Sequence, residues 1–87
     1  MTCEIRPIQQ LKDSLITNNV KSVHAEYDVE SEEAVIILNM KENFPGPEYF
    51  KVALHKGVEI RPFKSLKAIV NTVKELGFSE VKMIIKG

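Results

Sequence analysis

The chain has 87 residues, 44% of them hydrophobic and 28% charged, and its 12 basic and 12 acidic residues leave no net charge. This length and balance predict one folded domain spanning residues 1–87 and exclude a disordered or fibrous chain. A net charge of zero also argues against the strongly basic surface of many nucleic-acid-binding proteins.

The cysteine content and the hydropathy favour a cytoplasmic protein. Cys3 is the single cysteine, so no internal disulfide can form, and the first ten residues contain no basic segment followed by an apolar run. We therefore expect a reducing compartment and no secretory signal. The longest apolar run, residues 34–38, is far shorter than the roughly 20 residues of a membrane span, so no membrane association is expected.

Charge is distributed unevenly along the chain. Residues 1–50 hold four basic and nine acidic side chains, whereas residues 51–87 hold eight basic and three acidic ones. Such an asymmetry indicates either an interaction surface or two parts of one fold that attract each other.

The first predicted element is an amphipathic helix over residues 7–18. Ile8, Leu11 and Leu15 recur at helical spacing, and Pro7 occupies a favourable position in the first turn. The helix is expected to end at the paired asparagines that follow, because asparagine tolerates the left-handed conformation of a helix stop.

Two strands with different patterns are predicted next. In residues 23–29 apolar side chains alternate with His24, Glu26 and Asp28, which predicts a half-buried strand with an acidic outer face. Residues 33–40 are apolar on both faces, as is typical of a central strand paired on both sides. The proline-glycine-proline sequence that follows predicts a loop.

Residues 49–63 predict a second hairpin. We prefer a three-residue loop that ends at Gly57, because this register sets apolar residues opposite one another, whereas a two-residue loop mixes apolar and charged partners. The preferred register places Lys51 directly across from Arg61 on the outer face. Like charges in that position are mildly destabilising.

A second helix and a last strand complete the chain. Ser65 is a good N-cap for a helix over residues 66–76, and Gly77 suits its left-handed C-cap. The alternation in residues 81–86 predicts a strand at or near a sheet edge, with outward lysines. Its inward residues are Val81, Met83 and Ile85.

The predicted order of elements indicates an α+β fold. A helix, four strands, a helix and a strand (α-β-β-β-β-α-β) suit two helices packed on one face of a mainly antiparallel sheet of about five strands. The sequence contains no internal repeat and no low-complexity tract, and a single α+β domain accounts for residues 1–87.

Over residues 7–76 this order, with a second helix that opens in FKSLKA, resembles double-stranded-RNA-binding domains. The step from a strand into FKSLKA also resembles the three-strand-plus-helix DNA-binding domains of phage and transposon integrases. The chain departs from the RNA-binding pattern by one extra strand, by the absence of a Gly-Pro-His loop, and by a lysine run reduced to Lys64 and Lys67. The resemblance is architectural and transfers no residue roles.

The residues form no catalytic or metal-binding pattern. His24, Glu26 and Asp28 share one strand face, but the outer two stand about 13 Å apart at ~3.3 Å per residue, too far for one ion. Cys3 and His55 have no neighbours suited to nucleophilic or proton-transfer chemistry, and phosphate-loop and paired-cysteine zinc patterns are absent from the sequence. We predict a protein that is not an enzyme, with no catalytic residues, no cofactor and no metal.

Basic side chains of the predicted hairpin and second helix form the candidate binding site. The first turn of that helix, residues 66–68, contains no acidic residue, so neighbouring lysines reinforce the partial positive charge of the helix start. The candidate binding residues are Lys51, Arg61, Lys64 and Lys67.

Two functions remain open, and a third, enzymatic alternative would need a deep pocket lined by His24 or His55. The first is a small accessory or regulatory protein that binds an anionic partner, either nucleic acid or an acidic protein surface, through these four cations. The second is a protein-interaction module or homodimer that uses a sheet edge, or the acidic strand face of Glu26, Asp28 and Glu30. In that case the acidic face would imitate a polyanion and inhibit a nucleic-acid-binding protein.

Overall fold

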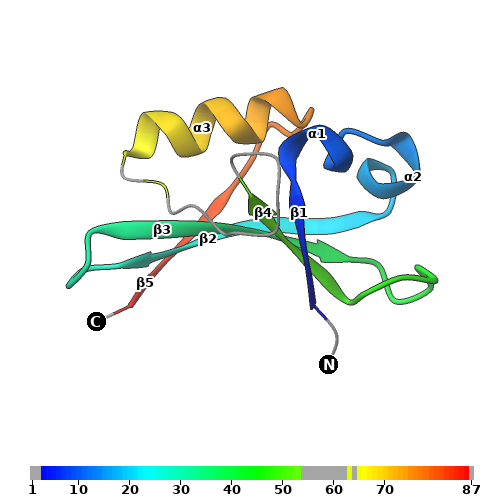
Figure 1. The fold of residues 1–87 in the computed structure, drawn as a ribbon, viewed down its shortest axis with the longest axis horizontal. Helices are drawn as coiled ribbons and strands as arrows, with labels where there is room; N and C mark the ends of the chain where they lie inside the picture. The colour runs from blue at the N-terminus through cyan, green and yellow to red at the C-terminus, as the bar shows by residue number, and fades with distance from the viewer. Residues whose placement is uncertain (1–2, 54–62, 64, 87) are drawn as a thin grey trace.

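A computed structural model of the chain describes residues 3–53, 63 and 65–86 (Figure 1). Five strands form one sheet in the order β1-β4-β3-β2-β5. The elements are β1 (Cys3–Pro7), α1 (Ile8–Leu11), α2 (Ser14–Thr17), β2 (Val20–Asp28), β3 (Glu33–Met40), β4 (Tyr49–Ala53), α3 (Leu66–Glu75) and β5 (Lys82–Lys86). None of the helices in this described part has the length and apolarity that a membrane crossing requires.

The sheet is mixed, so the prediction of a mainly antiparallel sheet was wrong. β3 pairs antiparallel with β2 and β4, whereas β1 pairs parallel with β4 and β2 pairs parallel with β5. A helix in the connection between two strands carries the chain back along the sheet, so that the next strand runs in the same direction. Helices follow β1 and β4, and β3 is the strand that opposes the other four.

The predicted first helix is divided, and a strand precedes it. Asp13 is extended, with φ −62° and ψ 130°, and its side chain accepts a hydrogen bond from the Leu15 amide, which starts α2 afresh. Such a local bond competes with a continuous helix. Pro7 belongs to β1 rather than to the helix, since its restricted φ also suits the end of an edge strand.

The core lies between the helices and one face of the sheet, here called the helix-side face. Figure 1 shows α1, α2 and α3 on this side. Alternate strand residues point to it. The buried apolar residues that form this core are Val23, Ala25, Ala34, Ile36, Leu38, Met40, Phe50 and Val52 from the sheet, and Leu11, Phe63, Ile69, Val73 and Leu76 from outside it. The other face, here called the open face, is not covered by any helix in the described part of the chain.

The predictions of the second helix, of a central strand and of a last strand at the edge are confirmed. α3 begins after Ser65, whose side chain accepts a hydrogen bond from the Ala68 amide, and it ends before Gly77 at φ 93°. A left-handed glycine at this position lets the Phe78 amide bond to the carbonyl of Val73. β3 is the central strand and β5 is an edge strand.

The predicted second hairpin falls only in part on described residues. Its first strand is β4, in which Lys51 is aligned with Ile37 of β3 on one side and Ile5 of β1 on the other. Residues 54–62, which include the predicted loop and Arg61, lie outside the described residues. Of the four strands predicted between the helices, three are described.

Candidate functional site

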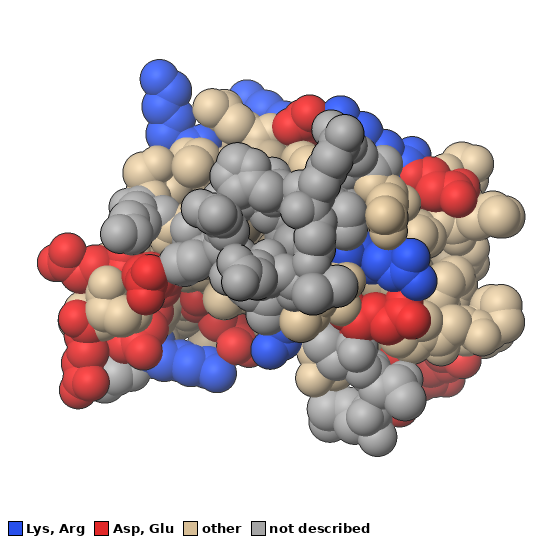
Figure 2. Space-filling model, viewed as in Figure 1, with Lys and Arg blue, Asp and Glu red and all other residues tan. Residues whose placement is uncertain are grey.

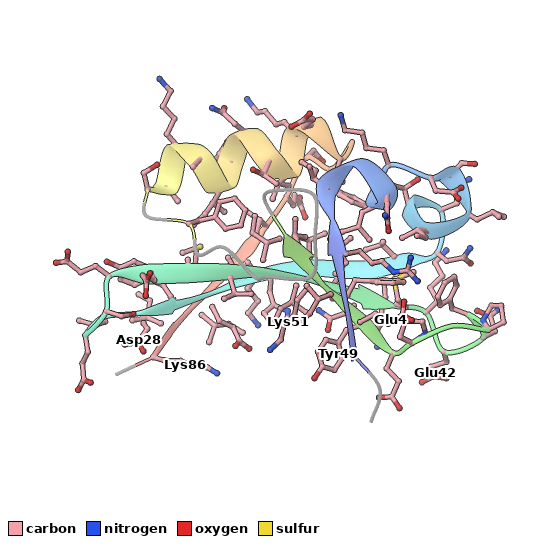
Figure 3. The ribbon with its side chains drawn as sticks, in the orientation of Figure 1. Glu4, Asp28, Glu42, Tyr49, Lys51 and Lys86 are labelled. Atoms are coloured by element: carbon pink, nitrogen blue, oxygen red, sulfur yellow. The ribbon has the colours of Figure 1, made fainter. Side chains whose placement is uncertain are left out.

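The predicted basic residues do not converge where the structure describes them. Lys51 lies on the open face of β4 and is partly exposed, as Figure 3 shows. Lys67 lies exposed in the first turn of α3, which packs on the helix-side face. Arg61 and Lys64 fall outside the described residues. The two described cations therefore occupy opposite sides of the sheet.

The predicted acidic strand face is largely engaged within the molecule. Glu26 Oε1 accepts a hydrogen bond from Lys86 Nζ at 2.9 Å, and Asp28 Oδ1 accepts one from the Glu30 amide at 2.9 Å, which closes the turn after β2. Figure 2 shows acidic side chains gathered over the β2–β3 turn, at the end of the sheet. Acidic charge therefore gathers at the turn as well as on the open face of β2.

A hydrogen-bonded network crosses the open face from β3 to β5. Asn39 Nδ2 lies 2.7 Å from His24 Nδ1 and 3.3 Å from Ser22 Oγ, and His24 Nε2 lies 3.3 Å from Glu26 Oε2. Because Asn39 donates to Nδ1, the neutral His24 ring carries its proton on Nε2 and donates it to Glu26. Lys86 completes the network from β5.

Lys86 also sets the protonation of Glu26. Its hydrogen bond to the carboxylate lowers the pKa of Glu26 below the ordinary value of 4.5, partial burial acts in the opposite direction, and His24 adds a smaller lowering effect. Glu26 therefore stays ionised under neutral and mildly acidic conditions and holds β5 against β2.

Replacing the carboxylate by Glu26→Gln is expected to change how stability depends on pH. A carboxylate whose pKa is lowered by folding adds stability above its unfolded value, near 4.5, and loses it as the pH falls through the lower folded value. The gap in unfolding free energy between wild type and Glu26→Gln should therefore be widest above pH 4.5 and close on acidification. Urea titrations across this range measure it. Lys86→Met should remove most of the pH-dependent difference between wild type and Glu26→Gln. A difference in unfolding free energy that does not change with pH would contradict the lowered pKa of Glu26.

The network borders an open depression of about 720 Å³ on the open face, beside the β3–β4 loop. Its charged lining is balanced, with three lysines and three glutamates. These are Lys21, Lys41, Lys51, Glu26, Glu42 and Glu48. Both ring nitrogens of His24 are already engaged, and no group of three or more potential metal ligands occurs among the described residues. The depression thus offers no concentrated charge of one sign, and the ring nitrogens of its histidine are both engaged.

The β5 edge is the other candidate surface. Met83 and Ile85 point to the helix-side face, as the alternation predicts, but their exposed fractions are 37% and 71%. The apolar core does not include them, whereas Tyr27 and Val81 pack against it. The helix layer thus ends short of β5 and leaves two large apolar side chains in water beside the backbone of an edge strand.

Sequence reasoning found β5 and its orientation but missed its exposure. The alternation of Lys82, Met83 and Lys86 tells which face a residue occupies, not whether a helix covers that face. The β5 edge and the open-face network are joined by the Glu26–Lys86 contact.

Comparison of the chain with protein-family models, curated proteins and solved structures gives no match.

Proposed function

We propose that this protein is a non-enzymatic interaction module whose β5 edge binds an extended segment of a partner polypeptide. The observation that carries the proposal is the exposure of Ile85 and Met83, 71% and 37%, on a strand at the end of the sheet. In the described part of the chain no strand pairs with the outer side of β5. Its outward N–H and C=O groups are then available to an added strand.

The composition of β5 suits a strand-binding edge better than an ordinary surface with isolated apolar residues. Isolated apolar residues on a surface are ordinary, but here two adjoin the unpaired backbone that an incoming strand needs. The exposed Lys82 and Lys86 end the strand on the open face. Charged residues on an edge strand discourage indiscriminate pairing. A short apolar edge bounded by lysines can therefore be selective.

The substitution Ile85→Lys is expected to weaken partner binding about tenfold or more, equivalent to a loss of about 1.4 kcal/mol. Ile85 is mostly exposed, so the fold should be retained. The partner would be recovered by affinity capture from the native cell at two ionic strengths, purified, and titrated by calorimetry. Leu15→Lys is the matched control, because Leu15 is 72% exposed but lies on α2. Equal weakening by both variants would refute the β5 site.

A second candidate is the binding of an anionic partner through the predicted cations Lys51, Arg61, Lys64 and Lys67. One observation favours it, namely that the first turn of α3 has no acidic residue and exposes Lys67. Duplex DNA and RNA should then bind at a salt concentration of about 50 mM. Binding should fall when Arg61, Lys64 and Lys67 are changed to Glu. Undetectable or unchanged binding in gel-shift titrations would reject this candidate.

A further inference from the structure

The two faces of β5 differ in chemistry. Met83 and Ile85 lie exposed on the helix-side face. Lys82, Ile84 and Lys86 lie on the open face, the lysines exposed and Ile84 partly buried. A strand that pairs with the outer side of β5 therefore meets apolar side chains on one face and two cations on the other.

β2, which already pairs with β5, shows what kind of strand matches it. The apolar Ala25 and Tyr27 are aligned with the two exposed apolar residues of β5. On the open face, Glu26 Oε1 accepts a hydrogen bond from Lys86 at 2.9 Å. β2 thus alternates polar side chains, two of them acidic, with apolar ones. Its apolar residues share a face with Met83 and Ile85, and its Asp28 is aligned with Lys86, the lysine that Glu26 contacts.

The lysines of β5 retain capacity for further carboxylates. Lys82 is aligned with His24 and forms no ion pair within the part of the chain that the structure describes. Lys86 contacts Glu26, but its side chain is 59% exposed and its ammonium group has three donors. Both cations can therefore meet acidic side chains from the outer side of the strand.

We infer that the segment bound at the β5 edge alternates acidic and apolar residues. Its carboxylates lie beside Lys82 and Lys86 on the open face, and its apolar side chains cover Met83 and Ile85 on the helix-side face. This inference rests on the proposed function and specifies the chemistry of the partner.

A second copy of the chain fits this edge less well. Full antiparallel overlap of two β5 strands places Lys82 of each copy opposite Lys86 of the other, and like charges in directly opposed positions are destabilising. A shorter overlap of the two β5 strands separates these lysines, but it leaves Lys82 without a residue opposite it. It also covers less of Met83 and Ile85. An acidic partner strand has neither disadvantage.

The test uses a synthetic peptide with the sequence of residues 23–30, VHAEYDVE, which carries the alternation that β5 already accepts from β2. A matched peptide has lysine in place of Glu26, Asp28 and Glu30. Fluorescence anisotropy with the intact protein should show the acidic peptide binding about tenfold more tightly than the lysine peptide. The preference should shrink as salt is added.

Two protein variants identify the surface and the charge involved. Ile85→Lys should abolish binding of the acidic peptide. Lys82→Glu should weaken the acidic peptide and strengthen the lysine peptide. Lys74→Glu, a matched change at an exposed residue of α3, should alter neither.

Each other outcome has a definite meaning. If both peptides bind equally and Ile85→Lys weakens both, the edge still binds strands and the acidic preference is wrong. If neither peptide binds, the inference fails, and the titration of the captured partner against Ile85→Lys decides the proposed function separately. A dimer in sedimentation that Ile85→Lys dissociates would make a second copy the occupant and overturn the inference.

Discussion

Leu38→Ala is expected to lower the free energy of unfolding by about 2 to 5 kcal/mol, since a deleted core side chain loses both its transfer free energy and its packing. Leu38 is 0% exposed and lies in the middle of β3, aligned with Val23 on one side and Phe50 on the other. Neighbours held in a ladder on both sides cannot close the cavity by moving. Small domains are stable by about 5 to 15 kcal/mol in total, so this is a large share.

Denaturant titration followed by circular dichroism measures the effect of Leu38→Ala. The control is Leu15→Ala, the same chemical change at a side chain that is 72% exposed, where a change within about 0.5 kcal/mol is expected. A loss below about 1 kcal/mol at Leu38 would show that β3 does not occupy the centre of the sheet.

Phe63→Ala is expected to have an effect of similar size, about 3 to 5 kcal/mol. Phe63 is 2% exposed, belongs to the core, and exchanges two backbone hydrogen bonds of 2.8 Å with Ala34. It thereby anchors the chain to β3 just before α3 begins. Loss of the ring leaves a cavity in the core beside β3 and is expected to weaken the backbone bridge to Ala34 as well.

Two measurements separate these contributions at Phe63. Denaturant titration gives the total loss, and hydrogen exchange at the Ala34 amide reports the bridge, because this amide donates to the Phe63 carbonyl. Leu66→Ala is the control, since Leu66 lies three residues further on and is 62% exposed. Comparable losses at the two positions would place Phe63 outside the core.

The long alternating and helical patterns were sufficient to predict most elements. The alternation around Ala25 and Glu26 predicted β2 and its faces, and the apolar run of residues 33–40 predicted a central strand, as the sheet order confirms. Ser65 and Gly77 predicted the ends of α3 within one residue. These signals are local, because propensity, capping and side-chain period act over a few residues.

Short elements were missed where two local signals competed. β1 has five residues and Ile5 is its sole aliphatic residue, so no alternation marked it. Pro7 favours a helix start, but its restricted φ suits a strand end equally well. Asp13 falls inside the predicted helix of residues 7–18, yet its side chain caps a new helix.

The candidate site depended still more on long-range packing. The period of β5 correctly assigned Met83 and Ile85 to the helix-side face. Their exposure follows from how far α3 reaches across the sheet, and no residue of β5 encodes that distance. Lys51 and Lys67 are close enough in sequence to suggest one basic patch. In the fold, however, the Lys51 side chain lies on the open face of the sheet, whereas Lys67 belongs to α3 on the helix-side face.

The sequence by itself determined the identity of the long elements and the face on which each of their strand residues lies, because these depend on neighbours a few residues apart. Tertiary structure alone decided the strand order, the parallel direction of β1 and β5 and the uncovered apolar edge. These properties depend on which distant segments pair and on where the helix layer ends, and both are set by the packing of the whole core.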